Sequence, residues 1–367
     1  MPRLLFFSRL YITGLFLSCY IAMKKNLFFI CSATFLLFLL YAAAELFLPV
    51  QKTQRNMEIE IPKGTTFRQA VALLHHEKLL RDTRIFLLAA RLSGTDRKIR
   101  AGFYSLWSGM SPLEILKVLL KGKIIEYEVK VLEGDSLTEI ADAFARAGII
   151  SAEEFMELAR DHDHLEYHGI SAPSVEGYIF PDTYMIPKGM DAEDALNTMI
   201  RRMREKYTEK LTARTQDLGM TENQVLTLAS IIEKEAVIDS ERSVISAVYH
   251  NRLRKNMMLQ ADPTSIYGVK SSKEKITLND LKRKTPYNTY RIKGLPPGPI
   301  ASPGLKSIVA ALYPENVPYL YFVAQDDRSH RFAESEEEHA ENVRLYRTRK
   351  QEMKNAPTEG SNAPPSS

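Results

Sequence analysis

The feature that most constrains this chain is a run of 18 residues without a charged side chain, which extends from Leu27 to Ala44. As a helix, such a run is just long enough to cross the roughly 30 Å hydrocarbon core of a bilayer. Lys24 and Lys25 precede the run, and this positive charge predicts that the N-terminal end stays in the cytoplasm. We therefore predict a single-pass membrane anchor over residues 24–48, with the remainder of the chain outside the cytoplasm.

The same region allows other interpretations. Ala42, Ala43 and Ala44 have the small side chains of a signal-peptide cleavage site, so the run could instead belong to a cleaved signal. A buried core helix is disfavoured because the run is apolar on all sides. Met23 is followed by two lysines, as at an ordinary protein start, and we interpret residues 1–22 as an over-long reading frame. The intact mass of the native protein distinguishes the two start sites.

Composition limits the remaining possibilities. The 367 residues are enough for two or three domains, and 45% apolar and 26% charged residues are typical of a globular protein. The formal net charge of +4 is too small to indicate nucleic acid as a partner. Both cysteines, Cys19 and Cys31, lie in the apolar N-terminal region. A disulfide framework and a cysteine metal site are therefore excluded for the rest of the chain.

Two similar segments follow the anchor at an offset of 70 residues, at 58–71 and 128–141. Each consists of an alternating strand, a glycine turn and an amphipathic helix. Thr66 and Ser136 are the expected helix caps, and Gln69 and Glu139 stand three residues later, where they would complete capping boxes. The pattern predicts a duplicated small α/β unit.

The strand–glycine–hydroxyl–helix pattern resembles LysM-type modules, which bind glycans that contain N-acetylglucosamine. A plain spacer that holds a later domain away from the membrane is an equally good interpretation. We predict a first small α/β module at 57–125 and a LysM-like module at 126–170. Helical patterns then dominate to about residue 350, interrupted by a proline-rich loop region at 260–304.

The predicted fold is therefore α+β: a transmembrane helix, small LysM-like α/β modules and a mostly helical domain at 171–350 with a loop-rich region suited to sugar binding. Helices are expected at about 191–218, 221–238, 240–255 and 336–354, with a strand at 319–324. The tail over 355–367 is rich in Pro, Ser, Gly and Asn, and we predict that it is disordered.

The helix that begins near Thr221 carries two candidate catalytic carboxylates. Glu233 and Glu235 lie on opposite flanks of its apolar face, while Thr227, Ser230 and Lys234 mark a polar side. Desolvation on such a face raises the pKa of a carboxyl group, as a general acid requires. An ordinary ion pair with a lysine or arginine is the alternative for each. Helical geometry does not choose between the two glutamates.

Aromatic and amide side chains recur in the segments that follow this helix. Tyrosine faces and planar amides suit sugar rings, and the prolines fix the loop backbone before binding. For each of these residues a purely structural role is an equally good interpretation. The candidate substrate contacts are Tyr249, Asn251, Gln260, Asp262, Thr264, Tyr287, Asn288 and Tyr290.

A series of short sequence words, in order, resembles the MltG/YceG-like endolytic murein transglycosylases. They are EGYIFPDTY at 176–184, LASIIEKEA at 228–236, NRL at 251–253, LQADPT at 259–264, YNTY at 287–290, GLPPGPIASPG at 294–304 and YLYFVA at 319–324. That family has its catalytic glutamate at the second Glu of the IIEKE word, which is Glu235 here, and Glu233 becomes a supporting residue. Family members commonly have Thr where this chain has Ala236.

The resemblance implies a lytic transglycosylase that cuts the β-1,4 bond between N-acetylmuramic acid and N-acetylglucosamine inside murein strands. It would leave 1,6-anhydro ends, terminate nascent strands and require neither a metal nor a cofactor. The expected partners are glycan strands, the inner membrane and peptidoglycan synthases, with the domain in the periplasm. Two alternatives stay open. One is a hydrolytic muramidase with Asp262 as second carboxylate, and the other is a non-catalytic glycan-binding scaffold.

Overall fold

The computed structural model describes residues 3–53, 55–97, 99–271, 274–325 and 328–355. Almost all of the tail that we predict to be disordered lies outside the described residues. The chain divides into two compact units. The first comprises Met1–Glu126 and Pro187–Gly189, and the second comprises Tyr127–Ile186 and Met190–Ser367.

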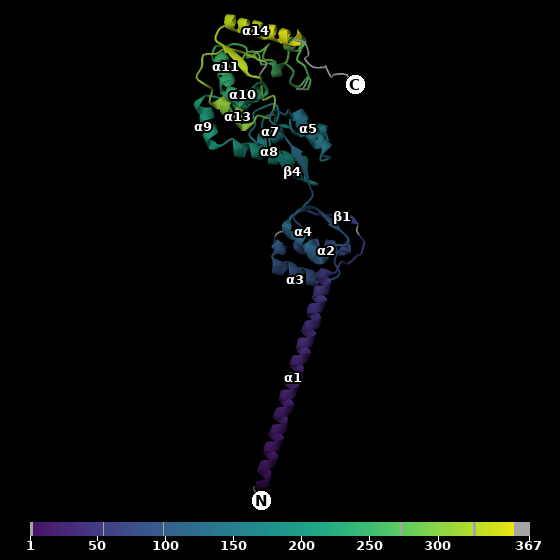
Figure 1. Ribbon diagram of the computed structural model, residues 1–367. Helices are drawn as coiled ribbons and strands as arrows, with labels where there is room; N and C mark the ends of the chain where they lie inside the picture. Colours follow the sequence, from purple (N-terminus) through teal and green to yellow (C-terminus); the bar gives the residue numbers. More distant parts are fainter. Residues whose placement is uncertain (1–2, 54, 98, 272–273, 326–327, 356–367) are drawn as a thin grey trace, which may run out of the picture. The chain divides into compact units, whose positions relative to one another are not determined.

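A single long helix, α1 (Arg3–Phe47), opens the first unit (Figure 1). Its stretch Met23–Phe47 has a mean hydropathy of 2.3, and none of that apolar window is buried. Large side chains such as Phe28 and Leu37 are exposed along it. Within the described residues this helix has the length and composition to cross a membrane, as the prediction for residues 24–48 requires.

The first unit continues with β1 (Asn56–Ile61), α2 (Phe67–His76), α3 (Thr83–Ser93), η1 (Thr95–Arg97), β2 (Gly102–Trp107) and α4 (Pro112–Lys121). β1 and β2 pair antiparallel, with Asn56 opposite Trp107 and Ile61 opposite Gly102. The helices cover the sheet with apolar side chains, among which Leu74 and Tyr104 are fully buried. The expected capping box of Thr66 and Gln69 is present at the start of α2.

The second unit begins with the same local pattern. Its elements are β3 (Glu126–Lys130), α5 (Leu137–Arg146), α6 (Ala152–Leu158), α7 (His162–Tyr167) and β4 (Thr183–Pro187), and β3 pairs with β4. Gly64 and Gly134 occupy the left-handed region in the equivalent turns, with φ of 81° and 83°. Ser136 and Glu139 form the second expected capping box. The predicted strand–turn–capped-helix repeat is confirmed at this local level.

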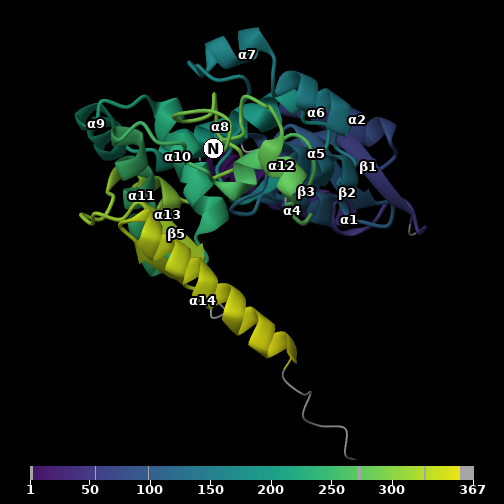
Figure 2. The same cartoon turned by 90° about the horizontal axis from the view of Figure 1, so that it is seen from above.

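Helices make up most of the remaining structure, together with one small hairpin. They are α8 (Ala192–Lys206), α9 (Glu209–Asp217), α10 (Glu222–Glu235), η2 (Asp239–Glu241), α11 (Arg242–Arg254), η3 (Asp262–Ser265), α12 (Leu278–Lys282), α13 (Leu305–Leu312) and α14 (Glu336–Asn355). The hairpin pairs β5 (Tyr321–Ala324) antiparallel with β6 (His330–Ala333). α14 contacts this hairpin and then runs on beyond it (Figure 2).

One predicted helix is divided. The expected helix over 191–218 separates into α8 and α9 because Tyr207 leaves the helical conformation, with ψ at 73°. The Tyr207 hydroxyl lies 2.5 Å from Thr215 Oγ1, a contact that holds the two helices together across the break. A periodic apolar pattern continues through such a corner, so periodicity alone does not reveal it.

Helix α10 lies at the centre of this unit, in contact with α9, α11 and α13 (Figure 1). Every residue from Val225 to Ile232 is buried. The polar side that we expect at Thr227 and Ser230 is therefore wrong, because both side chains are fully enclosed. Thr227 donates to the Asn223 carbonyl at 2.6 Å, and Ser230 accepts the Ile300 N–H at 3.0 Å. Both hydroxyls are buried because they have partners there.

One hydrophobic core extends through the second unit. It contains Phe144 and Phe155 from α5 and α6 as well as Ile232 from α10. The predicted LysM-like module and the predicted catalytic domain thus both contribute side chains to it. The division between them at residue 170 stays a prediction.

Candidate active site

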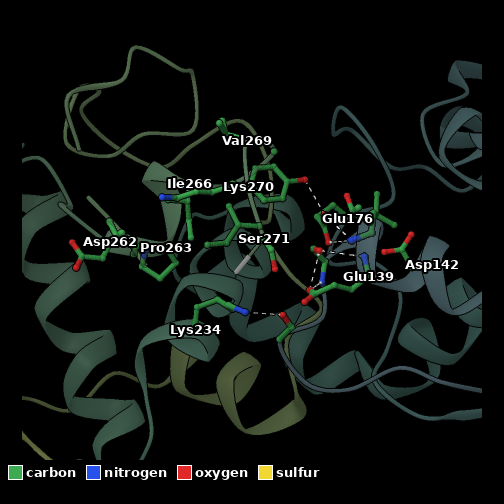
Figure 3. A pocket seen from close by; sticks show the side chains of 18 of the residues that line it. Glu139, Asp142, Glu176, Lys234, Asp262, Pro263, Ile266, Val269, Lys270 and Ser271 are labelled. Atoms are coloured by element: carbon green, nitrogen blue, oxygen red, sulfur yellow. Dashed lines mark hydrogen bonds between the residues drawn. The ribbon is translucent and has the colours of Figure 1, made fainter. Parts of the chain in front are cut away.

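A cavity of about 660 Å³ lies in the second unit, between the α5–α6 pair and the end of α10. Figure 3 shows Glu139, Asp142 and Glu176 on one side of this pocket and Asp262 and Pro263 on the opposite side. The wall between them is the segment that follows η3 and extends to Ser271. The lining combines apolar side chains with polar and charged ones, which are Ser136, Thr138, Glu139, Asp142, Arg160, Glu176, Lys234, Glu235, Asp262, Lys270 and Ser271.

Glu235 is the last residue of α10, and its side chain lines this pocket. Solvent reaches part of the residue, but protein atoms surround it on most sides. Tyr249 Oη is 3.5 Å from Glu235 Oε1, and the backbone N–H of Asp262 also donates to the carboxyl group. Burial, and secondly the negative charge of Asp262, raises the pKa of Glu235 to about 8. The group therefore holds a proton at neutral pH.

Glu233 lies two residues earlier in very different surroundings. Its side chain is 5% exposed and does not line the pocket. One oxygen accepts from Arg242 Nη1 at 3.0 Å, and the other accepts the Gly304 N–H at 2.9 Å. Arg242 also donates to Ser307 at 2.5 Å. Glu233 is thus the centre of a buried ion pair that fastens α10 to α11 and α13.

Asp262 is the only other predicted site residue of the described chain that lines the pocket. It begins η3 and is exposed. Its Oδ1 accepts a hydrogen bond of 2.5 Å from the Tyr290 hydroxyl. Burial, and secondly this hydrogen bond, raises the pKa of Tyr290 above its ordinary value. Tyr290 therefore stays a neutral donor and orients Asp262 beside the pocket.

Three predicted contact residues are buried and fully engaged with the chain. Asn288 donates to the carbonyls of Asp280, Leu281 and Arg283 at 2.7–3.2 Å. Thr264 donates to the Ala261 carbonyl at 2.6 Å and lies 2.8 Å from Thr289. Asn251 donates to the Val317 and Tyr319 carbonyls at 2.9 and 2.8 Å. These side chains hold the loop framework, which is the structural role left open for them.

Like Tyr290, the predicted contacts Tyr249, Gln260 and Tyr287 also lie outside the pocket lining. Tyr249 is 1% exposed, and only its hydroxyl reaches Glu235. Gln260 accepts a hydrogen bond of 3.0 Å from Arg252. Tyr287 stacks at a tilt on Tyr267, with ring centroids 4.6 Å apart. Direct contact of these residues with a sugar stays a prediction.

Glu176 is a pocket residue that the sequence analysis did not single out. It is 2% exposed, and its two oxygens each accept the Leu137 N–H at 3.1 Å. Tyr267 donates to Oε2 at 2.8 Å (Figure 3). Burial is the main cause that raises the pKa of Glu176 to about 7. The sequence feature that could have indicated Glu176 is its position as the first residue of the EGYIFPDTY word. A single acidic residue in a turn does not, however, reveal its distant partners.

The turn that carries Glu176 requires a glycine next to it. Gly177 has φ of 77°, and a Cβ atom there would lie 2.4 Å from Cβ of Pro299. Gly177 therefore lets this turn lie directly against the proline-rich loop. The same loop is tied to the α5 end, because Gly134 donates to the Ser302 carbonyl at 2.9 Å. The pocket walls are thus connected by backbone contacts as well as by side chains.

Lys234 joins two of these walls from below the pocket in Figure 3. Its ammonium donates to the Gly134 carbonyl at 3.0 Å, between α10 and the turn before α5.

Lys270 donates to Asp280 at 2.6 Å and to the Lys275 carbonyl at 2.8 Å. Among the described residues no group of three or more His, Cys, Asp or Glu side chains is placed to hold a metal ion.

Comparison with known proteins agrees with this architecture. The profile of the YceG-like family matches residues 59–345. An endolytic murein transglycosylase from Bacillus subtilis (strain 168) is 31% identical over 321 residues, which cover 83% of this chain and 89% of that protein. An endolytic murein transglycosylase from Streptococcus pneumoniae (strain D39) is 28% identical over 330 residues, which cover 81% of this chain and 59% of the pneumococcal protein.

A solved structure is similar too. The crystal structure of a YceG-like protein from Listeria monocytogenes is 30% identical and has a TM-score of 0.55. The match covers 79% of this chain and 99% of the Listeria chain. The family profile spans most of the chain, and the relatives cover it from the first unit to the helical region. The chain belongs to the YceG-like family.

Proposed function

We propose that this protein is an endolytic murein transglycosylase and that Glu235 is its acid. The observation that carries the proposal is a carboxyl group with a pKa of about 8 on the wall of a pocket large enough for sugar rings. The names of the relatives point to murein as the substrate. Hydroxyl, carboxyl and ammonium groups around the pocket suit the many hydroxyls of a glycan.

One carboxyl group is sufficient for the proposed reaction. Protonated Glu235 gives its proton to the glycosidic oxygen as the bond from C1 of N-acetylmuramic acid to that oxygen breaks. The 6-hydroxyl oxygen of the same sugar then bonds to C1, and its proton passes to the Glu235 carboxylate. The acid is regenerated, no water is consumed, and the product carries a 1,6-anhydro ring.

Hydrolysis is the second candidate because Asp262 lines the same pocket and its charge acts on Glu235. A second carboxylate could activate water or attack the anomeric carbon. Mass spectrometry of cleaved murein distinguishes the two, since a hydrolytic product is heavier than the anhydro product by one water, about 18 Da. We expect the anhydro mass. A product at the heavier mass would assign the protein as a muramidase.

The matched test of the acid is Glu235→Gln in the full chain, assayed on purified murein strands. The amide keeps the shape of the side chain but has no proton to donate, so cleavage should fall at least about a thousandfold while strand binding persists. If the wild-type protein bound strands and never cleaved them, the scaffold interpretation would replace the enzyme.

The location and the accessory units belong to the same proposal. The Met23–Phe47 stretch of α1 would anchor the protein in the inner membrane by a single pass, with both units in the periplasm. The strand–helix–helix–strand order of the first unit supports a LysM-like glycan-binding role for the small modules. Peptidoglycan synthases as partners follow from the resemblance, and a pull-down with the membrane-embedded full chain would identify them.

A further inference from the structure

Glu176 connects three parts of the pocket that are far apart in the sequence. It sits in the turn before β4, beside the proline-rich loop. It accepts the first free N–H of helix α5, that of Leu137. It also accepts the hydroxyl of Tyr267, whose ring lies along the pocket wall against Tyr287. Ser136 caps its own helix, whereas Glu176 links this helix end to the Tyr267 segment.

We propose that Glu176 is a positioning residue, which holds the α5 end and the Tyr267 ring in the arrangement that presents a glycan strand to Glu235. This inference rests on the proposed function. Glu176 is enclosed at 2% exposure, so it acts through Tyr267 and α5 rather than by touching the reacting atoms. Tyr267 and the α5 residues Thr138 and Asp142 line the pocket directly and are the groups it would place.

The ionised form of Glu176 is the form that makes all of these contacts. Both oxygens of a carboxylate accept hydrogen bonds, whereas one oxygen of a protonated carboxyl group carries the proton and acts as a donor. Lys234 from α10 favours the ionised form, while Glu139 from α5 opposes it, and Tyr267 donates to it. Tyr287 lies near enough for its own pKa to be raised, mainly by burial and secondly by the charge of Glu176. With a pKa of about 7, Glu176 changes state within the physiological range.

The test compares wild type, Glu176→Gln and Tyr267→Phe as full chains in cleavage of murein strands across pH. Glutamine resembles the protonated state, so the variant should match wild type within about twofold near pH 5.5 and be about tenfold lower in kcat/KM near pH 7.5. Glu235 stays mostly protonated over this interval, since its pKa is about 8, and its titration is common to wild type and variant. Tyr267→Phe should give a similar loss near pH 7.5, and the double variant should lose no more than the single ones.

Glu114→Gln is the matched control, because Glu114 completes a capping box of α4 in the first unit and is not one of the residues that line the pocket. Its activity should equal wild type at every pH. Equal activity of Glu176→Gln and wild type near pH 7.5 would overturn the inference. A loss by the same factor at all pH values would also overturn it, because that is the signature of a purely structural residue.

Amide hydrogen exchange keeps the inference testable if wild type cleaves nothing and the proposed function fails. In Glu176→Gln, exchange should accelerate both in the segment 134–140 and in the segment 264–271. In Tyr267→Phe, exchange should accelerate only in the segment 264–271. The segment 134–140 should be unchanged, because Glu176 still accepts the Leu137 N–H. If neither segment changes in Glu176→Gln, Glu176 does not hold the two walls together.

Discussion

Replacing Glu235 with glutamine should stabilise the second unit, although it removes the proposed catalytic acid. A carboxyl group whose pKa rises from 4.5 to about 8 on folding binds its proton more tightly in the native state. The native state is therefore penalised as pH rises from about 4.5 to about 8, where the unfolded chain releases the proton and the folded one does not. Glutamine does not ionise and is free of this penalty.

The size of the effect follows from the shift. At pH 7 the difference between the pH and the unfolded pKa of 4.5 sets the penalty on the free energy of folding. Its upper bound is about 3 kcal/mol. Solvent reaches part of Glu235 through the pocket, and screening reduces the value, so we expect roughly 1–3 kcal/mol. For a unit of this size that is a rise in Tm of roughly 3–10 °C. The difference should vanish below about pH 3.5, where the carboxyl group is protonated in both states.

Calorimetry of the full chain in detergent, at several pH values, measures this difference. The single tryptophan, Trp107, lies in β2 of the first unit, so its fluorescence provides an internal control that should not move. Glu233→Gln is the opposite control. It leaves Arg242, which has a side chain 10% exposed, without its main buried partner, and should destabilise the unit by roughly 3 kcal/mol. The reasoning is refuted if Glu235→Gln is no more stable than wild type at pH 8, or if its gain does not depend on pH.

Three further changes test the framework of the pocket. Gly177→Ala, which forces a Cβ atom against Pro299 at positive φ, should cost more than about 2 kcal/mol in chemical denaturation. Ser230→Ala removes the acceptor of the Ile300 N–H and should cost roughly 1–2 kcal/mol, and an unchanged denaturation midpoint would show that the proline-rich loop does not need this bond. Asn288→Ala leaves three carbonyls without their donor and should cost roughly 2–4 kcal/mol, with faster amide exchange around α12, whereas Asn288→Asp should recover none of it.

Local features of the fold were predictable because they depend on nearby residues. Thr66 and Ser136 form their capping boxes with side chains three positions away, and the glycine turns before them need only a local backbone conformation. The corner at Tyr207 was missed because the apolar pattern continues through it. Ser230 was assigned to a polar face because the sequence does not reveal its buried partner. That partner is the Ile300 N–H, which donates to the Ser230 hydroxyl from 70 positions further along the chain.

The candidate site shows the same limit. Glu235 and Asp262 line the pocket, and the sequence drew attention to both. The α5 wall was not expected there, because nothing in an amphipathic helix indicates which distant loop its capped end will face. Glu176 likewise depends on Leu137 and Tyr267, 39 and 91 positions away. The asparagine and threonine side chains that suggested sugar contacts hold loops in this structure, and the chemistry of a single sequence does not separate that role from binding.

The position of Glu235 on α10 explains why it and Glu233 differ so much. Both glutamates are near the C-terminal end of a buried helix, where the unpaired carbonyls carry partial negative charge and disfavour a carboxylate. Glu233 offsets that cost with Arg242 and the Gly304 N–H. Glu235 has no cation among its hydrogen-bond partners in the described chain, and Asp262 adds further negative charge. Helix end, burial and neighbouring charge therefore act in one direction at Glu235 and raise the pKa of the carboxyl group that faces the pocket, whereas Glu233 is held in a buried ion pair with Arg242.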